Sequence, residues 1–297
     1  VFYKRSLGYR LIYEIEFSLT PTHLLRNKEY HEYYFVKKPI IKYFVKKADK
    51  LNICTDEVCE FFYKHMSGSK EKINRMTLGA DPDFFYEDYD ERRDLRISMG
   101  IADDEVLITT SGKIEPHKRY DVFIKSISSI KNEYPRIKFL IIGSGTESAI
   151  KDVLDMAQKE SIKDNIILKP FAKKEELRKL YNASDIGVWT RATITTLEAI
   201  GCGLPVIIPN IQSTKHLVED GNGLLYEYGD SSQLADRLKY YMLQENRIKA
   251  REKALNAFRN KYSYLTLAKQ LVNNVYMSVL KNGSTANDLS LRNNIKL

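Results

Sequence analysis

Two lysines and a glycine follow the apolar segment 106–110 at a spacing that suits an anionic ligand. Within the segment 111–119, Gly112 stands where a strand would turn toward a helix, and Lys113 and Lys118 are five positions apart. Two cations at that spacing can converge on one anion beside the positive end of a helix, which is chemistry suited to a diphosphate. The alternative is that both lysines lie on an exposed loop and contact only water.

A pair of glycines, Gly143 and Gly145, follows the apolar segment 138–142. Glycines at such a turn let backbone amides approach a phosphate closely. Ser148 stands where a dinucleotide-binding fingerprint has its third glycine, and this disfavours a nicotinamide-dependent oxidoreductase. A plain tight turn between a strand and a helix remains the alternative.

A hydroxyl-rich helix start with a nearby carboxylate is expected at residues 193–198. The backbone amides of Thr193, Ile194 and Thr195 could bind phosphate, and Glu198 could accept two hydroxyls of a ribose. In the alternative interpretation, Thr195 and Glu198 form a capping box that only closes the helix.

The segments around these residues alternate between strand and helix patterns. Strands are expected at 106–110, 138–142, 166–169, 186–189 and 206–209. Helices are expected at 118–133, 146–160, 173–183, 195–202, 214–219 and 231–244. This alternation predicts an α/β fold with a parallel sheet and helices on both faces, because each right-handed crossover packs back on the sheet. Ligands of such sheets bind at the carboxyl ends of the strands.

The chain divides into four expected parts. Residues 1–85 form a partial α/β domain, with strands at 11–15, 51–54 and 75–78 and helices at 29–47 and 57–66. Residues 86–260 form a complete Rossmann-like domain, and the linker between the two is expected at 79–90. A helix at 261–281 is expected to pack back toward the first domain, and residues 282–297 to form a mobile tail.

Composition narrows the function classes. A chain of 297 residues, 43% of them hydrophobic, can give two domains a core each. No apolar run approaches the ~20 residues that a spanning helix needs. The three cysteines form no CxxC pair and no metal-ligand set, so free thiols in a reducing compartment, the cytoplasm, are the simplest expectation. We also expect no bound metal and no cofactor.

The net charge of +8 favours anionic partners. Six lysines lie between residues 37 and 50 and alternate with apolar residues, as in a basic helix on an anionic membrane surface. The alternative is an apolar stripe facing a core with the lysines in water. We expect a peripheral membrane contact and no nucleic-acid partner.

Taken together and in this order, the three site segments resemble the donor domain of glycosyltransferase family 4, within the GT-B fold. Smaller segments support the resemblance: Ala48-Asp49-Lys50-Leu51, Leu78-Gly79-Ala80-Asp81, Leu180-Tyr181 with Ala183-Ser184-Asp185, and Gly221-Asn222-Gly223-Leu224. The match runs from about residue 48 to about residue 277.

The resemblance implies a retaining, metal-independent enzyme that transfers a sugar from a nucleotide sugar to a glycan or lipid-linked acceptor. It implies that Lys113 and Lys118 hold the diphosphate together with amides at Gly145 and at 193–195. Glu198 would then hold the ribose. The strand end at Pro170 and Phe171 would lie beside the base, and the first domain would offer the acceptor.

The sequence departs from the family pattern at three places. Thr190 stands eight positions before Glu198, where the family often has a first glutamate. Glu14 or Glu16 occupies the strand end where a catalytic histidine is common, and Glu16 is the residue we favour for that role. On the order of 100 residues of the acceptor domain have no counterpart, so a missing N-terminal half or partner subunit is expected. A nucleotide-sugar-binding protein without transferase activity, a non-catalytic subunit or a truncated enzyme, therefore remains the alternative.

Overall fold

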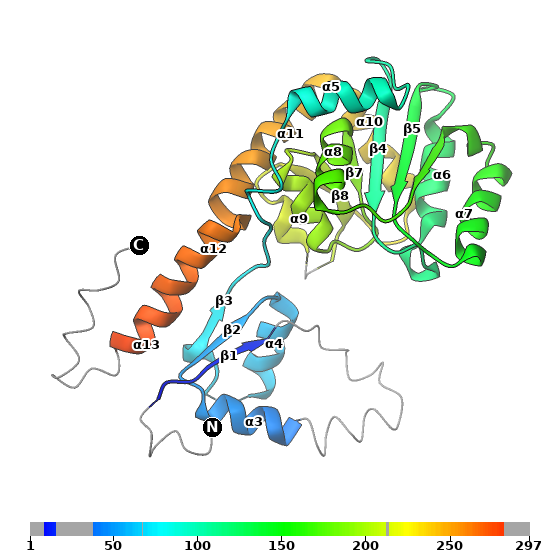
Figure 1. Ribbon diagram of the computed structural model, residues 1–297. Coiled ribbons are helices and arrows are strands. Elements are labelled where there is room, and N and C mark those ends of the chain that lie inside the picture. Colours follow the sequence, from blue (N-terminus) through cyan, green and yellow to red (C-terminus); the bar gives the residue numbers. More distant parts are fainter. Residues whose placement is uncertain (1–8, 16–37, 67, 212–213, 282–297) are drawn as a thin grey trace. The chain divides into compact units, whose positions relative to one another are not determined.

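The computed structural model describes residues 9–15, 38–66, 68–211 and 214–281 (Figure 1). The chain divides into two compact units. The larger unit consists of residues 78–266, and the smaller one combines the described residues up to 77 with those from 267 onward. The domain limits expected at residues 85 and 260 stay predictions. Strands alternate with helices in most of the chain, so the expected α/β class is confirmed.

A six-stranded parallel sheet forms the centre of the larger unit. Its strands are β4 (Val106–Ser111), β5 (Ile137–Ile142), β6 (Ile166–Lys169), β7 (Ile186–Val188), β8 (Val206–Pro209) and β9 (Gly223–Tyr226). Their spatial order is β6-β5-β4-β7-β8-β9. The chain therefore builds the sheet outward from β4 in one direction and then returns to build the other half from β7. In sheets of this type, ligands bind at the carboxyl ends of the strands where the order reverses, here at β4 and β7.

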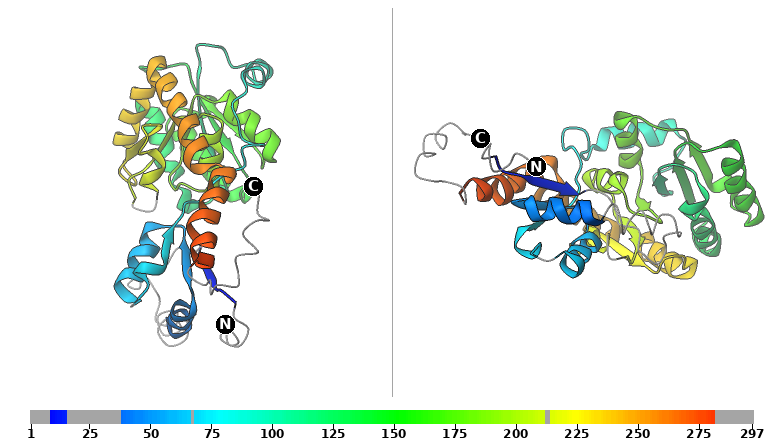
Figure 2. Two further views of the ribbon diagram at one scale, coloured as in Figure 1. Left: turned by 90° about the vertical axis from the view of Figure 1, so that its left-hand side faces the viewer. Right: turned by 90° about the horizontal axis from the view of Figure 1, so that it is seen from below.

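Side chains of the strands alternate between two cores, one on each face of the sheet. Leu107 and Leu140 pack in one core, whereas their neighbours Ile108 and Phe139 pack in the other. Helices α6 (Tyr120–Ile130), α7 (Glu147–Lys159) and α10 (Ser231–Met242) cover one face, and α8 (Lys174–Ala183) and α9 (Ile194–Gly201) the other (Figure 2). Short 3₁₀ turns lie at Pro116–Lys118, Lys163–Asn165 and Lys215–Val218. With both faces covered, only the strand ends are available to a ligand.

Helix α5 (Tyr89–Ser98) lies partly in the segment expected to be a linker. Asp88 caps its start by accepting a hydrogen bond from the Glu91 N–H at 2.9 Å. Arg96 is buried and donates to Asp185 at 3.0 Å, and Arg92 donates to the other carboxylate oxygen at 2.7 Å. Tertiary ion pairs thus hold this helix, which has no buried apolar residue. The linker prediction is wrong for residues 89 and 90.

The smaller unit has a three-stranded parallel sheet of β1 (Ile12–Ile15), β2 (Lys50–Ile53) and β3 (Ile73–Arg75). Helices α3 (Lys38–Lys47) and α4 (Asp56–His65) pack on it, and a 3₁₀ turn lies at Lys70–Lys72.

The C-terminal helical stretch comprises α11 (Gln244–Ala257), a π-helical turn at Phe258–Tyr262, α12 (Tyr264–Leu271), a second π-helical turn at Val272–Tyr276 and α13 (Met277–Lys281). Within the described residues, none of the helices has the length and apolarity to cross a membrane.

Candidate functional site

A cavity of about 700 Å³ opens at the carboxyl ends of β4, β5 and β6. It lies beside the point where the strand order reverses. It is lined by Ser111, Gly112, Lys113, Ile114, Glu115, Pro116, Ile142, Gly143, Ser144, Gly145, Thr146, Ala149, Phe171, Ala172, Leu177 and Thr195. A cavity of this size suits a ligand as large as a nucleotide.

Glycines let the loops after β4 and β5 lie against each other. Gly143 has φ +155°, and a Cβ atom on it would stand 1.8 Å from the carbonyl oxygen of Gly112. A Cβ atom on Gly145 would stand 2.5 Å from the carbonyl oxygen of Ile114. Residues with side chains cannot replace these glycines without moving the backbone. The glycine pair therefore serves close backbone packing at the wall of the cavity, which is more than a plain tight turn.

Three backbone amides of these loops are already bonded within the protein. The N–H of Gly112 donates to Ile142 O, that of Ile114 to Ser144 O and that of Gly143 to Lys169 O, each at 2.9 Å. The N–H of Gly145, by contrast, makes no hydrogen bond with any described residue. Of the glycine amides at this wall, only that of Gly145 is thus available to a ligand.

Two lysines, Lys113 and Lys118, follow the carboxyl end of strand β4. Lys113 is exposed and lines the larger cavity. Lys118 is half-buried, and its Nζ lies 4.0 Å from the position that a Cβ atom on Gly112 would take. Burial lowers the pKa of the Lys118 amine, the charge of Arg191 lowers it further, and the Glu115 carboxylate opposes both effects. Neither lysine forms an ion pair with a residue that the structure describes, so both charges are available to an anion.

Arg191 was not predicted as a site residue, although its charge acts on Lys118. It is exposed and stands two positions before Thr193, at the start of α9. A cation immediately before a hydroxyl-rich helix start is the signal that could have identified it.

The start of α9 brings hydroxyl groups to the cavity. Thr195 lines the cavity, and its hydroxyl lies 2.9 Å from that of Thr193. Thr196 accepts a hydrogen bond from the Thr193 N–H at 3.2 Å and completes a capping box with it. The alternative in which Thr195 and Glu198 form this box is therefore wrong.

Glu198 is consequently not needed to cap its helix. Its carboxylate is partly buried, and burial raises the pKa of this group while the charge of Lys174 lowers it. It forms no hydrogen bond or ion pair with the part of the chain that the structure describes. A partly buried acid without such a partner is a candidate ligand group.

The structure brings about half of the predicted site residues to one cavity. The predicted residues that line it are Gly112, Lys113, Gly143, Gly145, Phe171 and Thr195. Those that do not line it are Lys118, Pro170, Thr193, Ile194 and Glu198. Glu16 lies outside the described residues. Sequence reasoning missed Ser144, whose hydroxyl accepts a hydrogen bond from the Phe171 N–H at 3.3 Å and joins the turns after β5 and β6.

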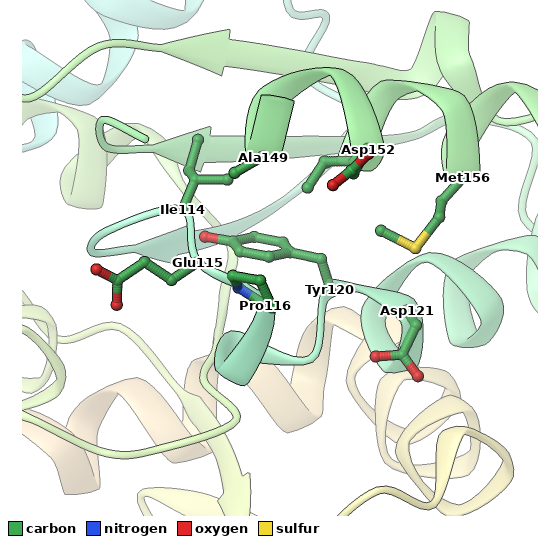
Figure 3. A pocket seen from close by; sticks show the side chains of 9 residues that line it. Ile114, Glu115, Pro116, Tyr120, Asp121, Ala149, Asp152 and Met156 are labelled. Carbon is green, nitrogen blue, oxygen red and sulfur yellow. The ribbon is translucent and has the colours of Figure 1, made fainter. Parts of the chain in front are cut away.

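A smaller cavity, of about 280 Å³, shares Ile114, Glu115, Pro116 and Ala149 with the larger one and is lined by helix α7 as far as Met156 (Figure 3). Its side chains include three carboxylates, those of Glu115, Asp121 and Asp152. Acids around a cavity disfavour an anionic ligand, so the larger cavity is the better diphosphate site. No cluster of three or more metal-ligating side chains occurs among the described residues.

The strand order and the large cavity at the reversal of the sheet define a Rossmann-type α/β protein. Residues 91–261 match the family model of glycosyl transferases group 1, which covers more than half of the chain, and the protein belongs to that family.

Relatives and solved structures agree with this assignment. The chain is 24% identical over 214 residues to a D-inositol 3-phosphate glycosyltransferase of Xylanimonas cellulosilytica, covering 68% of this chain and 51% of that protein. It is similar to the crystal structure of Anabaena Alr3699/HepE in complex with UDP, with a TM-score of 0.78, 16% identity, and coverage of 92% of this chain and 74% of that one. The structure of WaaG, a glycosyltransferase involved in lipopolysaccharide biosynthesis, gives a TM-score of 0.68 at 18% identity, covering 88% and 74%.

These similarities confirm the predicted GT-B fold. The chain spans about half the length of the curated relatives that it matches.

Proposed function

We propose that this chain is the donor-binding part of a glycosyltransferase that moves a sugar, of the hexose type, from a nucleoside-diphosphate sugar to an acceptor. The observation that carries the proposal is the half-buried amine of Lys118 beside Gly112, with Lys113 on the same loop and no competing carboxylate bonded to either. An unpaired cation in a partly desolvated place attracts a diphosphate more strongly than one in water. The UDP complex of the similar Anabaena protein is consistent with such a ligand.

Residues of the cavity lining and predicted site residues outside it have separate roles in this proposal. Lys118 and Lys113 hold the diphosphate and stabilise the charge that develops on it as the bond to the sugar breaks. The N–H groups of Gly145, Ile194 and Thr195 add neutral donors. The Thr193 N–H is already bonded to the Thr196 hydroxyl and is not one of them. Glu198 accepts the ribose hydroxyls, and the segment at Pro170 and Phe171, where Phe171 is 74% exposed, offers an aromatic face to the base.

We further propose that the reaction proceeds with retention of configuration, as in glycosyltransferase family 4, and without a metal ion. Cationic side chains and helix-terminal amides neutralise the departing diphosphate, which is the role that a divalent cation has in other sites. The acceptor is a glycan or a lipid-linked molecule, and Glu16 is the residue that we propose as catalytic on the acceptor side. The WaaG similarity is consistent with a lipid-linked acceptor, and a cytoplasmic protein at the membrane surface would reach one.

A thermal-shift panel tests the donor site. Uridine, guanosine and adenosine diphosphates are added to the protein, each with and without EDTA. We expect one of them to raise the melting temperature equally in both conditions, since a ligand at 100 times its dissociation constant adds about 2.7 kcal/mol of stability. Loss of the shift in EDTA would contradict the metal-free proposal, and no shift with any of the three would contradict the donor site itself.

A second candidate function is nucleotide-sugar binding without transfer. The residue at position 190 favours this second function. Thr190 offers the sugar no carboxylate, and the hydroxyl of Thr190 donates to a backbone carbonyl oxygen instead. The measurement that separates the two is the release of nucleoside diphosphate from the matching nucleotide sugar. An enzyme releases it by transfer or slow hydrolysis, whereas a binding subunit gives the thermal shift alone.

A further inference from the structure

We propose that Thr190 is a positioning residue that holds Lys118 in place for the donor diphosphate. The inference rests on the proposed function of Lys118. Thr190 does not act as a ligand of the sugar in this inference. The hydroxyl of Thr190 donates a hydrogen bond of 2.8 Å to the carbonyl oxygen of Lys118. Thr190 is 4% exposed, so water does not compete for this bond.

Two successive residues after β7 hold the two ends of the 111–118 loop. The indole N–H of Trp189 donates to the carbonyl oxygen of Ser111 at 3.2 Å, where the loop begins. The hydroxyl of Thr190 donates to Lys118, where the loop ends. Strand β7 lies next to β4 in the sheet, and both side chains are buried, so the loop is fixed to the rigid centre of the larger unit. Residues on rigid elements position a ligand group more accurately than residues on a free loop.

The backbone immediately after Lys118 needs such support. Arg119 has φ +48°, a left-handed conformation that is unfavourable for a residue with a side chain. Its guanidinium donates two hydrogen bonds of 2.9 Å to Asp121 and lies 6.0 Å from the ring centroid of Tyr228. These contacts hold Arg119 itself, whereas the Thr190 hydroxyl is the side-chain bond made to Lys118 directly. Without it, the amine of Lys118 loses the fixed backbone from which it extends.

The test compares Thr190→Val, which keeps the side-chain shape and removes the donor, with Thr190→Ser, which keeps the donor. Binding is measured by calorimetry with whichever of uridine, guanosine and adenosine diphosphates the parent binds most tightly, and with the corresponding nucleoside. Thr190→Val should weaken diphosphate binding by roughly three- to tenfold, the effect of one lost hydrogen bond, and nucleoside binding by less than about twofold. Thr190→Ser should stay within about twofold of the parent. Thr190→Ala replaces the valine variant if the latter does not fold.

Thr109→Val is the matched control. Thr109 is also buried, and its hydroxyl donates to the Leu140 carbonyl at 3.2 Å within the sheet. This variant should lower the melting temperature without changing diphosphate affinity, so a merely structural loss is distinguishable from lost positioning.

A double-mutant cycle with Lys118→Ala separates this inference from the proposed function. If Thr190 acts through Lys118, adding Thr190→Val to Lys118→Ala should change diphosphate affinity by less than about twofold. Equal losses for nucleoside and diphosphate, an undiminished loss in the Lys118→Ala background, or parent-like binding by Thr190→Val would each overturn the inference. Should Lys118→Ala alone bind diphosphates like the parent, the proposed donor site is wrong. A weakened Lys118→Ala together with a parent-like Thr190→Val refutes the positioning role only.

Discussion

The fold alters the ionisation of Lys118 and of Glu198. Burial lowers the pKa of the Lys118 amine and raises that of the Glu198 carboxyl, so in each case the fold disfavours the charged form. Neither side chain forms an ion pair with a described residue that would offset this cost. Ionisable groups whose charged form the fold disfavours are common at sites that bind a ligand.

Diphosphate binding should weaken as the pH rises through the lowered pKa of Lys118. The protonated amine attracts the phosphates, and the free protein releases this proton at a lower pH than an ordinary lysine does. The dissociation constant should therefore increase by up to about tenfold per pH unit above that pKa. Calorimetry across the alkaline range measures the effect. Lys118→Arg is the control, because arginine stays charged, and an equal pH dependence in that variant would contradict the assignment to Lys118.

The pH dependence of folding stability has the opposite sign to that of diphosphate binding. Because the pKa of Lys118 is lower in the folded protein than in the unfolded chain, the unfolded chain binds more protons between the two values. The contribution of this lysine to the free energy of unfolding therefore rises with pH in that window. Raised stability with weakened binding distinguishes this residue from a purely structural one.

Glu198→Gln should weaken nucleotide binding and leave the melting temperature unchanged or slightly higher. The variant removes a carboxylate that burial disfavours, and the capping of α9 by Thr193 and Thr196 is unaffected. Thermal denaturation and nucleotide titration on the same samples measure both effects. Thr196→Ala is the control and should lower stability by about 1 kcal/mol, the usual effect of a lost cap. A Glu198→Gln variant with lower stability and parent affinity would show that the carboxylate is structural.

Helix α5 depends mainly on charged contacts, because Leu95 is only partly buried against the core and Arg96 is the buried residue of the helix. Its buried contact is the Arg96 guanidinium, which donates to Asp185 and to the carbonyl oxygens of Ala183, Ala102 and Glu105. Asp185 in turn accepts a hydrogen bond from the Leu107 N–H at 2.8 Å, at the start of β4. The helix is thus connected to the strand whose far end carries the site.

Arg96→Met should destabilise the protein by about 2 kcal/mol or more. Asp185 loses one of its two cations while staying buried, and three carbonyl oxygens lose their donor. Urea denaturation followed by circular dichroism measures the change. Arg93→Met is the matched control on the same helix, because Arg93 is exposed and its partners among the described residues are Asp90 and Asp94. Equal destabilisation by the two variants would contradict the role given to the buried pair.

The positive charge of the chain is concentrated partly on helix α3 of the smaller unit. Lys42 and Lys46 are exposed, whereas Ile41 and Val45 are buried against the sheet. Ile40 remains 51% exposed. The apolar face of the helix is thus largely used within its own unit, as in the alternative interpretation of this segment, and any membrane contact of α3 would be mainly electrostatic.

We predict that the protein floats with vesicles of phosphatidylglycerol and phosphatidylcholine at low salt and less so at high salt. Each lysine near an anionic surface contributes about 1 kcal/mol, which salt screens. Replacing Lys42 and Lys46 by glutamate should abolish flotation. The control replaces Lys151 and Lys159, two exposed lysines of α7, in the same way. Equal loss in both double variants would indicate an effect of net charge alone, and protein that stays in the soluble fraction at low salt would refute the membrane contact.

The sequence by itself determined the parallel sheet and the segments that form the cavity. Strands β6 and β8 lie at the predicted residues, because short apolar runs between breaking residues are a local signal. The glycines that follow β4 and β5 were equally predictable from the sequence. Strand β9, which begins with Gly223, and helix α5 were not predicted, since one has a weak pattern and the other is stabilised by Asp185, far along the chain.

Only the tertiary structure decided what the individual side chains do. It partly buries Lys118, assigns the cap of α9 to Thr196 instead of Glu198, and directs the Thr190 hydroxyl to a carbonyl 72 positions away. Burial and hydrogen bonds between distant segments depend on which strands are neighbours and in which register they pair. Here β4 pairs with β7, which follows it only after two further strands, and no local pattern in the sequence encodes that pairing.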